Sequence, residues 1–271
     1  MKLKSKIIAV AIAAVFSSAA FAQSGATSKV NAENLNQNQS GLLNTQQMDL
    51  GNASSGGKSN VTVKGASQNQ SGLLNTQKME IGNASGKGES KVNATNIRQN
   101  QSGLLNTQEA KIGNASGGGK SNVTAKNINQ NQSGLLNTQK MEIGNASGKG
   151  ESKVNATNIR QNQSGLLNTQ EAKIGNASGG GKSNVTAKNI NQNQSGLLNT
   201  QKLEIGNASN KGQSKVNATD IRQNQSGLLN TQEAKIGNAA NGSKSDVTVK
   251  GMSQNQSGLL NTQKANVGNA N

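Results

Sequence analysis

The sequence contains no cysteine, histidine, proline, tryptophan or tyrosine, and its two phenylalanines, Phe16 and Phe21, lie close to the N-terminus. Without cysteine and histidine the chain has no disulfide, no thiolate nucleophile, no imidazole base and no His/Cys zinc site. Beyond Phe21 it also lacks the aromatic side chains on which nucleic-acid bases stack. These absences argue against an enzyme, and we expect no cofactor and no metal.

Large aliphatic residues are scarce as well. After Ala22, leucine, isoleucine and valine supply 41 of 249 residues, or 16%, which is below the roughly 20% that marks many disordered chains. Composition therefore disfavours an ordinary globular core and keeps a disordered, secreted low-complexity protein as one alternative. The same segment has 25 basic and 12 acidic residues, a net charge of +13, which predicts loose, salt-dependent binding to extracellular DNA or acidic polysaccharide.

The first 22 residues have the pattern of a secretory signal peptide. Three lysines precede the apolar stretch 7–16, and Ala20-Phe21-Ala22 forms a small-x-small cleavage site. Ten apolar residues are too few for a membrane span, which needs about 20. We therefore expect cleavage after Ala22, a short N-terminal lead at 23–27, export through a bacterial periplasm to the cell surface or medium, and no membrane insertion afterwards.

A repeat of 31 residues fills the remainder of the chain. The segment Asn-Gln-Ser-Gly-Leu-Leu-Asn-Thr-Gln occurs eight times at this spacing, without insertion or deletion. Repeats of this length are typical of stacked architectures, in which each unit covers the apolar face of the next. The predicted repeat domain spans 28–271, divided into 28–58, 59–89, 90–120, 121–151, 152–182, 183–213, 214–244 and 245–271.

Within each unit, apolar and polar residues alternate with a period of two, which predicts strands with one covered face. In the third unit Val92 and Ala94 lie in one alternating run, and Ile97 begins a second run shifted by one residue. The shift predicts a bulge or corner. We therefore expect an all-β fold, a parallel in-register β-solenoid whose coils contain two main strands or three short ones.

Several amide positions are identical in all eight units, among them those of Gln99, Gln101, Asn106, Gln108 and Asn114. Stacked amides hydrogen-bond to one another along the axis of a cross-β stack, and buried amides without partners are costly. We therefore predict structural amide columns at Gln37, Gln68, Gln99, Gln130, Gln161, Gln192, Gln223 and Gln254; at Asn44, Asn75, Asn106, Asn137, Asn168, Asn199, Asn230 and Asn261; and at Gln46, Gln77, Gln108, Gln139, Gln170, Gln201, Gln232 and Gln263.

Charges also follow the repeat. From the second unit on, lysine and glutamate alternate at the position of Glu109, and the signs are reversed two residues later at the position of Lys111, except for the neutral Asn266 in the last unit. In a parallel stack with strands about 4.8 Å apart, this pattern places opposite charges over one another and fixes the register. Each exposed pair contributes only a few tenths of a kcal/mol, so the main effect is the removal of repulsion.

No capping element is recognisable at either end of the repeats, and open strand edges favour pairing with another copy of the chain. Placing the last unit on the first unit of a second molecule sets Lys250 beside Glu33 and Asp246 beside Lys29. The even number of units keeps the alternation of charge in phase across this joint. The sequence thus predicts a head-to-tail homopolymer joined at these four residues.

The third to seventh units contain Ile-x-Gln, then a glycine, then Asn-x-Gln, as at Ile97, Gln99, Gly103, Asn106 and Gln108 of the third unit. In this pattern the repeat resembles the curlin repeats of bacterial functional amyloids, and more weakly the Asn/Gln/Gly-rich repeats of Fap-type amyloid subunits. The resemblance implies an exported subunit that crosses the outer membrane unfolded, polymerises into extracellular fibres, and supports biofilm matrix and adhesion. It also implies a secretion channel and a nucleator as partners. In the third unit the matching residues are Ile97, Gln99, Gly103, Asn106, Gln108, Ala110, Ile112, Gly113, Asn114 and Ala115.

Two further features keep other interpretations open. A regular column of threonines, represented by Thr107, is compatible with a monomeric binding module such as an ice-binding protein or a surface adhesin. The adjacent Leu104 and Leu105 predict one outward leucine per unit, unless a corner tucks both inside. An exposed leucine column would favour lateral bundling.

Overall fold

The structure is a computed structural model. It describes residues 16–18, 27–51, 58–82, 84, 89–113, 120–144, 147, 151–175, 182–206, 208–209, 213–237, 239 and 244–268. Most of the predicted leader 1–22 and of the lead 23–27 lies outside the described residues, as do most positions of the glycine-rich links. Among the described residues every regular element is a β-strand.

Long and short strands alternate along the chain. The long strands are β2(Thr27–Leu42), β4(Lys58–Leu73), β6(Glu89–Leu104), β8(Lys120–Leu135), β10(Glu151–Leu166), β12(Lys182–Leu197), β14(Gln213–Leu228) and β16(Ser245–Ser257). The short strands are β3(Thr45–Leu50), β5(Thr76–Ile81), β7(Thr107–Ile112), β9(Thr138–Ile143), β11(Thr169–Ile174), β13(Thr200–Ile205), β15(Thr231–Ile236) and β17(Thr262–Val267), and a further strand, β1(Phe16–Ser18), precedes them all. One long strand and the short strand after it form one rung.

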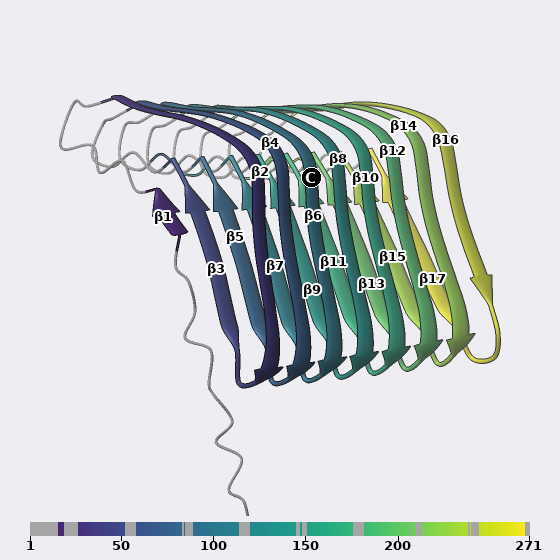
Figure 1. Cartoon of the computed structure of the whole chain (residues 1–271). Helices are drawn as coiled ribbons and strands as arrows, with labels where there is room; N and C mark the ends of the chain where they lie inside the picture. The colour runs from purple at the N-terminus through teal and green to yellow at the C-terminus, as the bar shows by residue number, and fades with distance from the viewer. Residues whose placement is uncertain are drawn as a thin grey trace, which may run out of the picture.

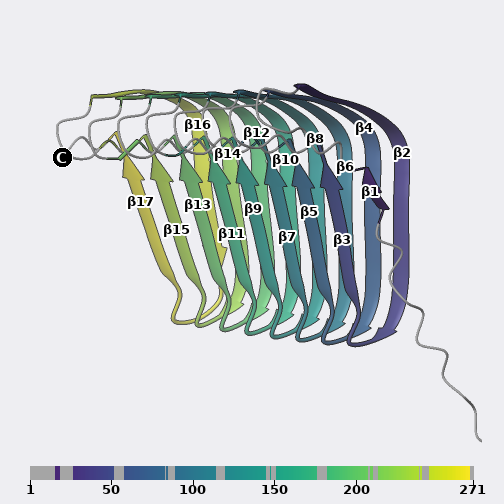
Figure 2. The ribbon, with the colours of Figure 1, turned by 90° about the vertical axis from the view of Figure 1, so that its left-hand side faces the viewer.

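The rungs stack into a parallel β-solenoid, which confirms the predicted fold class. The long strands form one sheet in the order β16 to β2, and the short strands form the other in the order β1 to β17. From β2 on, paired residues are equivalents 31 positions apart, as Gln99 pairs with Gln130. Figures 1 and 2 show the two sheets as opposite walls of one stack, joined at one edge by tight turns.

Each long strand turns a corner where the alternation of the sequence slips. Asn96 has φ of 58°, and residues on both sides of it remain in strand conformation. The left-handed region favours glycine, asparagine and aspartate, and all eight rungs have one of these residues here: Asn34, Gly65, Asn96, Asn127, Asn158, Asn189, Asp220 and Gly251. Figure 1 shows the long strands bending over the top of the solenoid and down its front wall.

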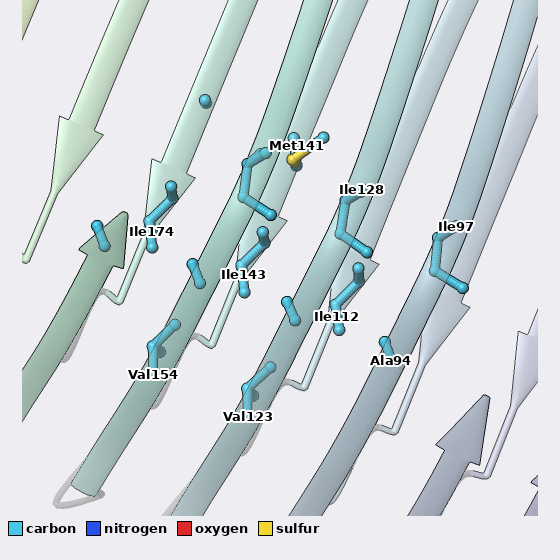
Figure 3. Close-up of a cluster of buried hydrophobic side chains, with 14 of the residues drawn as sticks. Ala94, Ile97, Ile112, Val123, Ile128, Met141, Ile143, Val154 and Ile174 are labelled. Atoms are coloured by element: carbon cyan, nitrogen blue, oxygen red, sulfur yellow. The ribbon is translucent and has the colours of Figure 1, made fainter. Parts of the chain in front are cut away.

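The core is a narrow apolar layer between the walls. In the third rung Val92, Ala94 and Ile97 of the long strand face Ala110 and Ile112 of the short strand, and all five are at most 2% exposed. Figure 3 shows Ala94, Ile97 and Ile112 together with apolar side chains of the neighbouring rungs between the two sheets. Fully burying a valine or isoleucine contributes about 1.5–3 kcal/mol, so every rung adds its own share of apolar burial.

A glycine column allows the backbones to stack at the turn. Gly103 has φ of 125°, and a Cβ at this position would lie 1.7 Å from the carbonyl oxygen of Gly72. That oxygen belongs to the backbone of the neighbouring rung, so no side-chain movement can relieve the clash. The invariant glycine of the repeat is thus required by the distance between rungs.

Candidate functional site

Two of the predicted glutamine columns form continuous hydrogen-bonded ladders inside the solenoid. Gln99 Nε2 donates to Gln68 Oε1 at 2.8 Å, and Gln108 Nε2 donates to Gln77 Oε1 at 2.7 Å. Gln99 Nε2 also donates to the backbone oxygen of Glu109 at 3.2 Å, which joins the long strand to the short one. The same bonds recur in the rungs above and below.

Burial makes these ladders energetically important. Gln99 is 1% exposed and Gln108 is fully buried. A satisfied hydrogen bond contributes about 0.5–1.5 kcal/mol net, whereas a buried amide atom left without its partner costs about 1–3 kcal/mol. The ladders therefore stabilise the correct register chiefly by penalising every other one.

The predicted asparagine column behaves differently from the expected amide-to-amide ladder. Asn106 is 1% exposed, and its Oδ1 accepts the backbone N–H of Asn75 at 3.2 Å. Its Nδ2 has no hydrogen-bond partner among the described residues. At the tight turn the short asparagine side chain therefore bonds to the backbone of the neighbouring rung.

Other invariant polar residues contribute further columns. The sequence had already indicated Gln101, whose Nε2 donates to Gln70 Oε1 at 3.1 Å, but it had not indicated Asn100 or Ser121. Asn100 Nδ2 donates to Asn69 Oδ1 at 2.7 Å on the outer surface, and Gln101 Nε2 donates to the backbone oxygens of Asn75 and Thr107. Ser121 Oγ donates to the Gly113 oxygen at the end of the preceding short strand. Their identity in all eight units was the available signal.

The four predicted joint residues lie at opposite ends of the solenoid, on the outer surface of the long-strand sheet. Glu33 in the first rung forms an ion pair with Lys64 at 3.3 Å, and Asp246 in the last rung pairs with Lys215 at 3.6 Å. Lys29 and Lys250 are exposed on the same surface. One chain does not bring the two ends together, so the joint itself requires a second copy.

The short-strand wall is electrically balanced. Its register places Lys78 opposite Glu109 and Glu80 opposite Lys111, as the alternation of the sequence predicts. The shortest ion pairs nevertheless form within a strand, with Lys78 to Glu80 at 2.7 Å and Lys111 to Glu109 at 3.0 Å, while Lys111 to Glu80 across rungs is 3.9 Å. Side chains two residues apart on one face reach each other more closely than side chains on adjacent rungs.

These pairs change the acid–base properties of the lysines. Hydrogen bonding to a glutamate two residues away raises the pKa of three lysines above its ordinary value of 10.5, and further carboxylates on the neighbouring rungs add to the effect. The three lysines are Lys78, Lys140 and Lys202.

The long-strand wall holds the excess positive charge of the described residues. Its basic residues are Lys29, Lys58, Lys64, Lys91, Arg98, Lys120, Lys126, Lys153, Arg160, Lys182, Lys188, Lys215, Arg222, Lys244 and Lys250, and its acidic residues are Glu33, Glu89, Glu151, Asp220 and Asp246. The three arginines also line a groove of about 1040 Å³ that follows the corner of the long strands. The fold thus separates a basic wall from a neutral one.

Both leucines of each pair lie on the outer edge of the solenoid. Leu104 is 38% exposed and Leu105 is 48% exposed, so the structure places neither in the core. The threonine column is exposed on the neutral wall, where Thr107 shares its face with Glu109 and Lys111.

The described residues contain no group of three side chains suited to bind a metal ion. They also include no helix long and apolar enough to cross a bilayer. No family model, curated protein or solved structure matches the chain.

Proposed function

We propose that the protein is a secreted structural subunit, without catalytic activity, that assembles head to tail into extracellular fibres serving biofilm matrix and adhesion. The observation that carries the proposal is the charge pattern of the terminal rungs. In the column of Lys29, lysine alternates with neutral asparagine until the last rung, where Asp246 replaces it. In the column of Lys64, lysine alternates with neutral threonine except in the first rung, which has Glu33.

This placement suits a joint between two copies. Stacking the last rung on the first rung of the next copy would set Asp246 between Lys215 and Lys29. Glu33 would likewise lie between Lys64 and Lys250. Within the chain, one half of each arrangement already forms an ion pair, so the joint would repeat a contact geometry that the solenoid uses internally.

The apolar interior supports the same arrangement. At the last rung Val247, Val249 and Met252 are only half-buried against the core, and Val267 is 46% exposed. Among the described residues nothing packs beyond β16 and β17. A second copy would cover these side chains and satisfy the free backbone groups of both edge strands.

The predicted leader bears on when assembly begins. Phe16–Ser18 form β1, which pairs in parallel with β3 and occupies the edge of the short-strand sheet. These residues precede the expected cleavage site at Ala22. Removal of the leader would free β3 for the next copy, so export and cleavage would precede polymerisation.

The joint is tested by reversing its charges. The double variant Glu33→Lys with Asp246→Lys should elongate more slowly than the wild type at low salt, because each lysine then faces lysines of both copies, and should recover at high salt as screening increases. Elongation is followed by light scattering and by electron microscopy of seeded fibres.

The matched control makes the same change inside the stack. Glu89→Lys with Glu151→Lys alters the same wall and the net charge equally, but lies in the third and fifth rungs. It should elongate like the wild type. Equal elongation of the joint variant, the control and the wild type at low salt would refute the proposed joint.

A binding role for acidic extracellular polymers is favoured by the basic wall. The arginines Arg98, Arg160 and Arg222 recur on every second rung and form no ion pair with the described residues, so they are available to anionic groups along the fibre. Replacing all three by glutamine should weaken binding to a sulfated polysaccharide and flatten its salt dependence. Replacing Lys111 and Lys173, which already pair with glutamate, should have less effect.

The other candidate functions have less support. An ice-binding face would be flat and neutral, whereas the exposed threonine column shares its wall with charged pairs. Thermal hysteresis measured on the purified protein would favour the ice-binding role. A secretion channel and a nucleator remain part of the proposal through the curlin resemblance alone.

A further inference from the structure

A continuous ridge of leucines follows the turn edge of the solenoid. Every rung contributes two adjacent leucines, and in the interior rungs they are 38–40% and 48–50% exposed. We call these sixteen residues the leucine ridge: Leu42, Leu43, Leu73, Leu74, Leu104, Leu105, Leu135, Leu136, Leu166, Leu167, Leu197, Leu198, Leu228, Leu229, Leu259 and Leu260. Its exposure adds up to that of about eight fully exposed leucines.

The second leucine of each pair is held in an unfavourable backbone conformation. Leu105 and its equivalents have φ of 54–55°, where a residue with a Cβ costs roughly 1–2 kcal/mol and glycine or asparagine is preferred. The chain follows that preference at its other left-handed positions, since the column of Asn96 contains only asparagine, aspartate and glycine and the column of Gly113 contains only glycine. At the turn, all eight rungs have leucine instead.

Neither the fold nor the core accounts for this choice. The Leu105 N–H donates to the Leu135 oxygen at 2.9 Å, a backbone bond that asparagine or glycine would form equally well. The side chain itself is half exposed and adds little to the core. A strained backbone that presents an apolar side chain to solvent in every rung indicates a contact outside the chain.

We infer that the leucine ridge is a lateral interface between two copies of this chain, packed side by side along the solenoid axis. A second copy has the same distance between rungs, so the leucines of one ridge can fit between those of the other along the full length. A fully buried leucine removes about 60–120 Å² of apolar surface from water, if its burial contributes about 1.5–3 kcal/mol at ~25 cal/mol/Å². The equivalent of about eight exposed leucines therefore offers about 500–1000 Å² of apolar surface per copy. A standard interface buries about 800 Å² per partner.

Charge supports the same occupant. The nine residues from Asn100 to Gln108 are uncharged in every rung, so the ridge is flanked by serine, asparagine and threonine. Two copies of a strongly basic protein can approach one another at this edge while their basic walls stay apart. The inference does not depend on head-to-tail growth, because two separate solenoids would pair in the same way.

The absence of native cysteine makes the interface directly testable. The single variant Leu136→Cys carries its thiol at the middle of the ridge, and Thr138→Cys in the same rung carries it on the neutral wall. Full overlap of two ridges sets Leu136 against Leu136 when the copies are parallel, and against Leu167 when they are antiparallel. Under mild oxidation, Leu136→Cys alone, or an equimolar mixture of Leu136→Cys with Leu167→Cys, should yield covalent dimers at least several-fold faster than Thr138→Cys.

A second variant removes the more exposed half of the ridge, the Leu105 column, without disturbing the backbone. Asparagine at all eight positions of the Leu105 column should retain the β spectrum and shift sedimentation from dimer to monomer; in fibres it should convert bundles to single filaments. Serine at all eight positions of the Thr107 column is the control and should leave association unchanged. Cross-linking no faster at the ridge than at Thr138→Cys, or fibres of the asparagine variant that still bundle, would overturn the inference.

These outcomes separate the lateral interface from the proposed joint. Fibres that elongate but never bundle or cross-link at the ridge would overturn the lateral interface and leave the joint standing. Dimers that cross-link at the ridge without forming any fibres would overturn the joint and leave the lateral interface standing. Binding of monomeric protein to neutral lipid vesicles through the ridge, without dimers, would identify a lipid surface as the occupant instead and refute the inference.

Discussion

Cutting one amide ladder in the middle of the stack should destabilise the whole solenoid. Gln139 Nε2 donates to Gln108 Oε1 at 2.8 Å, and Gln139 Oε1 accepts from Gln170 Nε2 at 2.8 Å. In Gln139→Leu both neighbours lose their partner inside a fully buried column, at about 1–3 kcal/mol each. Apolar burial of the new leucine offsets part of this, since full burial contributes about 1.5–3 kcal/mol.

The expected net loss is therefore about 2 kcal/mol in the free energy of unfolding. It is measured by urea titration followed by far-ultraviolet circular dichroism, since the repeats contain no tryptophan or tyrosine for fluorescence. The measurement is made at low protein concentration, where association does not contribute to stability.

Two controls isolate the ladder. Met141→Leu places leucine in the same rung, in a column where the sixth rung already has Leu203, and should cost less than about 1 kcal/mol. Gln263→Leu removes an exposed amide in the last rung, where a single bond to Gln232 is lost, and should be nearly neutral. If Gln139→Leu proves as stable as Met141→Leu, the ladders do not stabilise the register as argued.

Further expectations follow from the turns, the ion pairs and the leader strand. Gly134→Ala should abolish the β spectrum, because the new Cβ would lie 1.7 Å from the Gly103 oxygen. As a control, Gly65→Asn introduces the residue that other rungs use at the corner and should be neutral or stabilising. A folded Gly134→Ala would contradict the close approach of the backbones. The glutamate-bonded lysines have pKa values raised above 10.5. Their contribution to the free energy of unfolding is therefore complete below pH 10.5 and is lost as the pH rises through the higher folded pKa values. Melting temperatures should fall only in that alkaline range. A precursor made uncleavable at Ala22 should elongate more slowly than the mature chain, because β1 occupies the edge of β3; equal rates in seeded assays would show that this edge does not limit growth.

Much of the fold could be predicted because its signals are local and repeated eight times. Alternation with a period of two assigns each side chain of a strand to the inside or the outside, and the slip at Asn96 marks the corner. A constant spacing of 31 residues aligns equivalent side chains in a parallel stack. The glutamine columns followed directly, since identical amides at a fixed spacing become vertical neighbours.

Other properties of the candidate site depend on contacts that the repeat does not encode. The Asn106 amide oxygen accepts a backbone N–H of the neighbouring rung, and the ion pairs of the neutral wall form within strands because of side-chain reach. Neither follows from which residues are aligned in a column. Distances and rotamers decide them, and these are set only when the rungs are stacked.

The sequence by itself determined the parallel solenoid, its rung length, its corner and its inward amides, because a strict repeat leaves one register in which like residues meet like residues. Only the tertiary structure decided that the lysine excess gathers on the long-strand wall while the short-strand wall is neutral. It also decided that both leucines of each pair face solvent, one of them at positive φ. The physical reason is that alternation separates inside from outside, whereas the wall on which an outward residue lies depends on where the chain bends and closes.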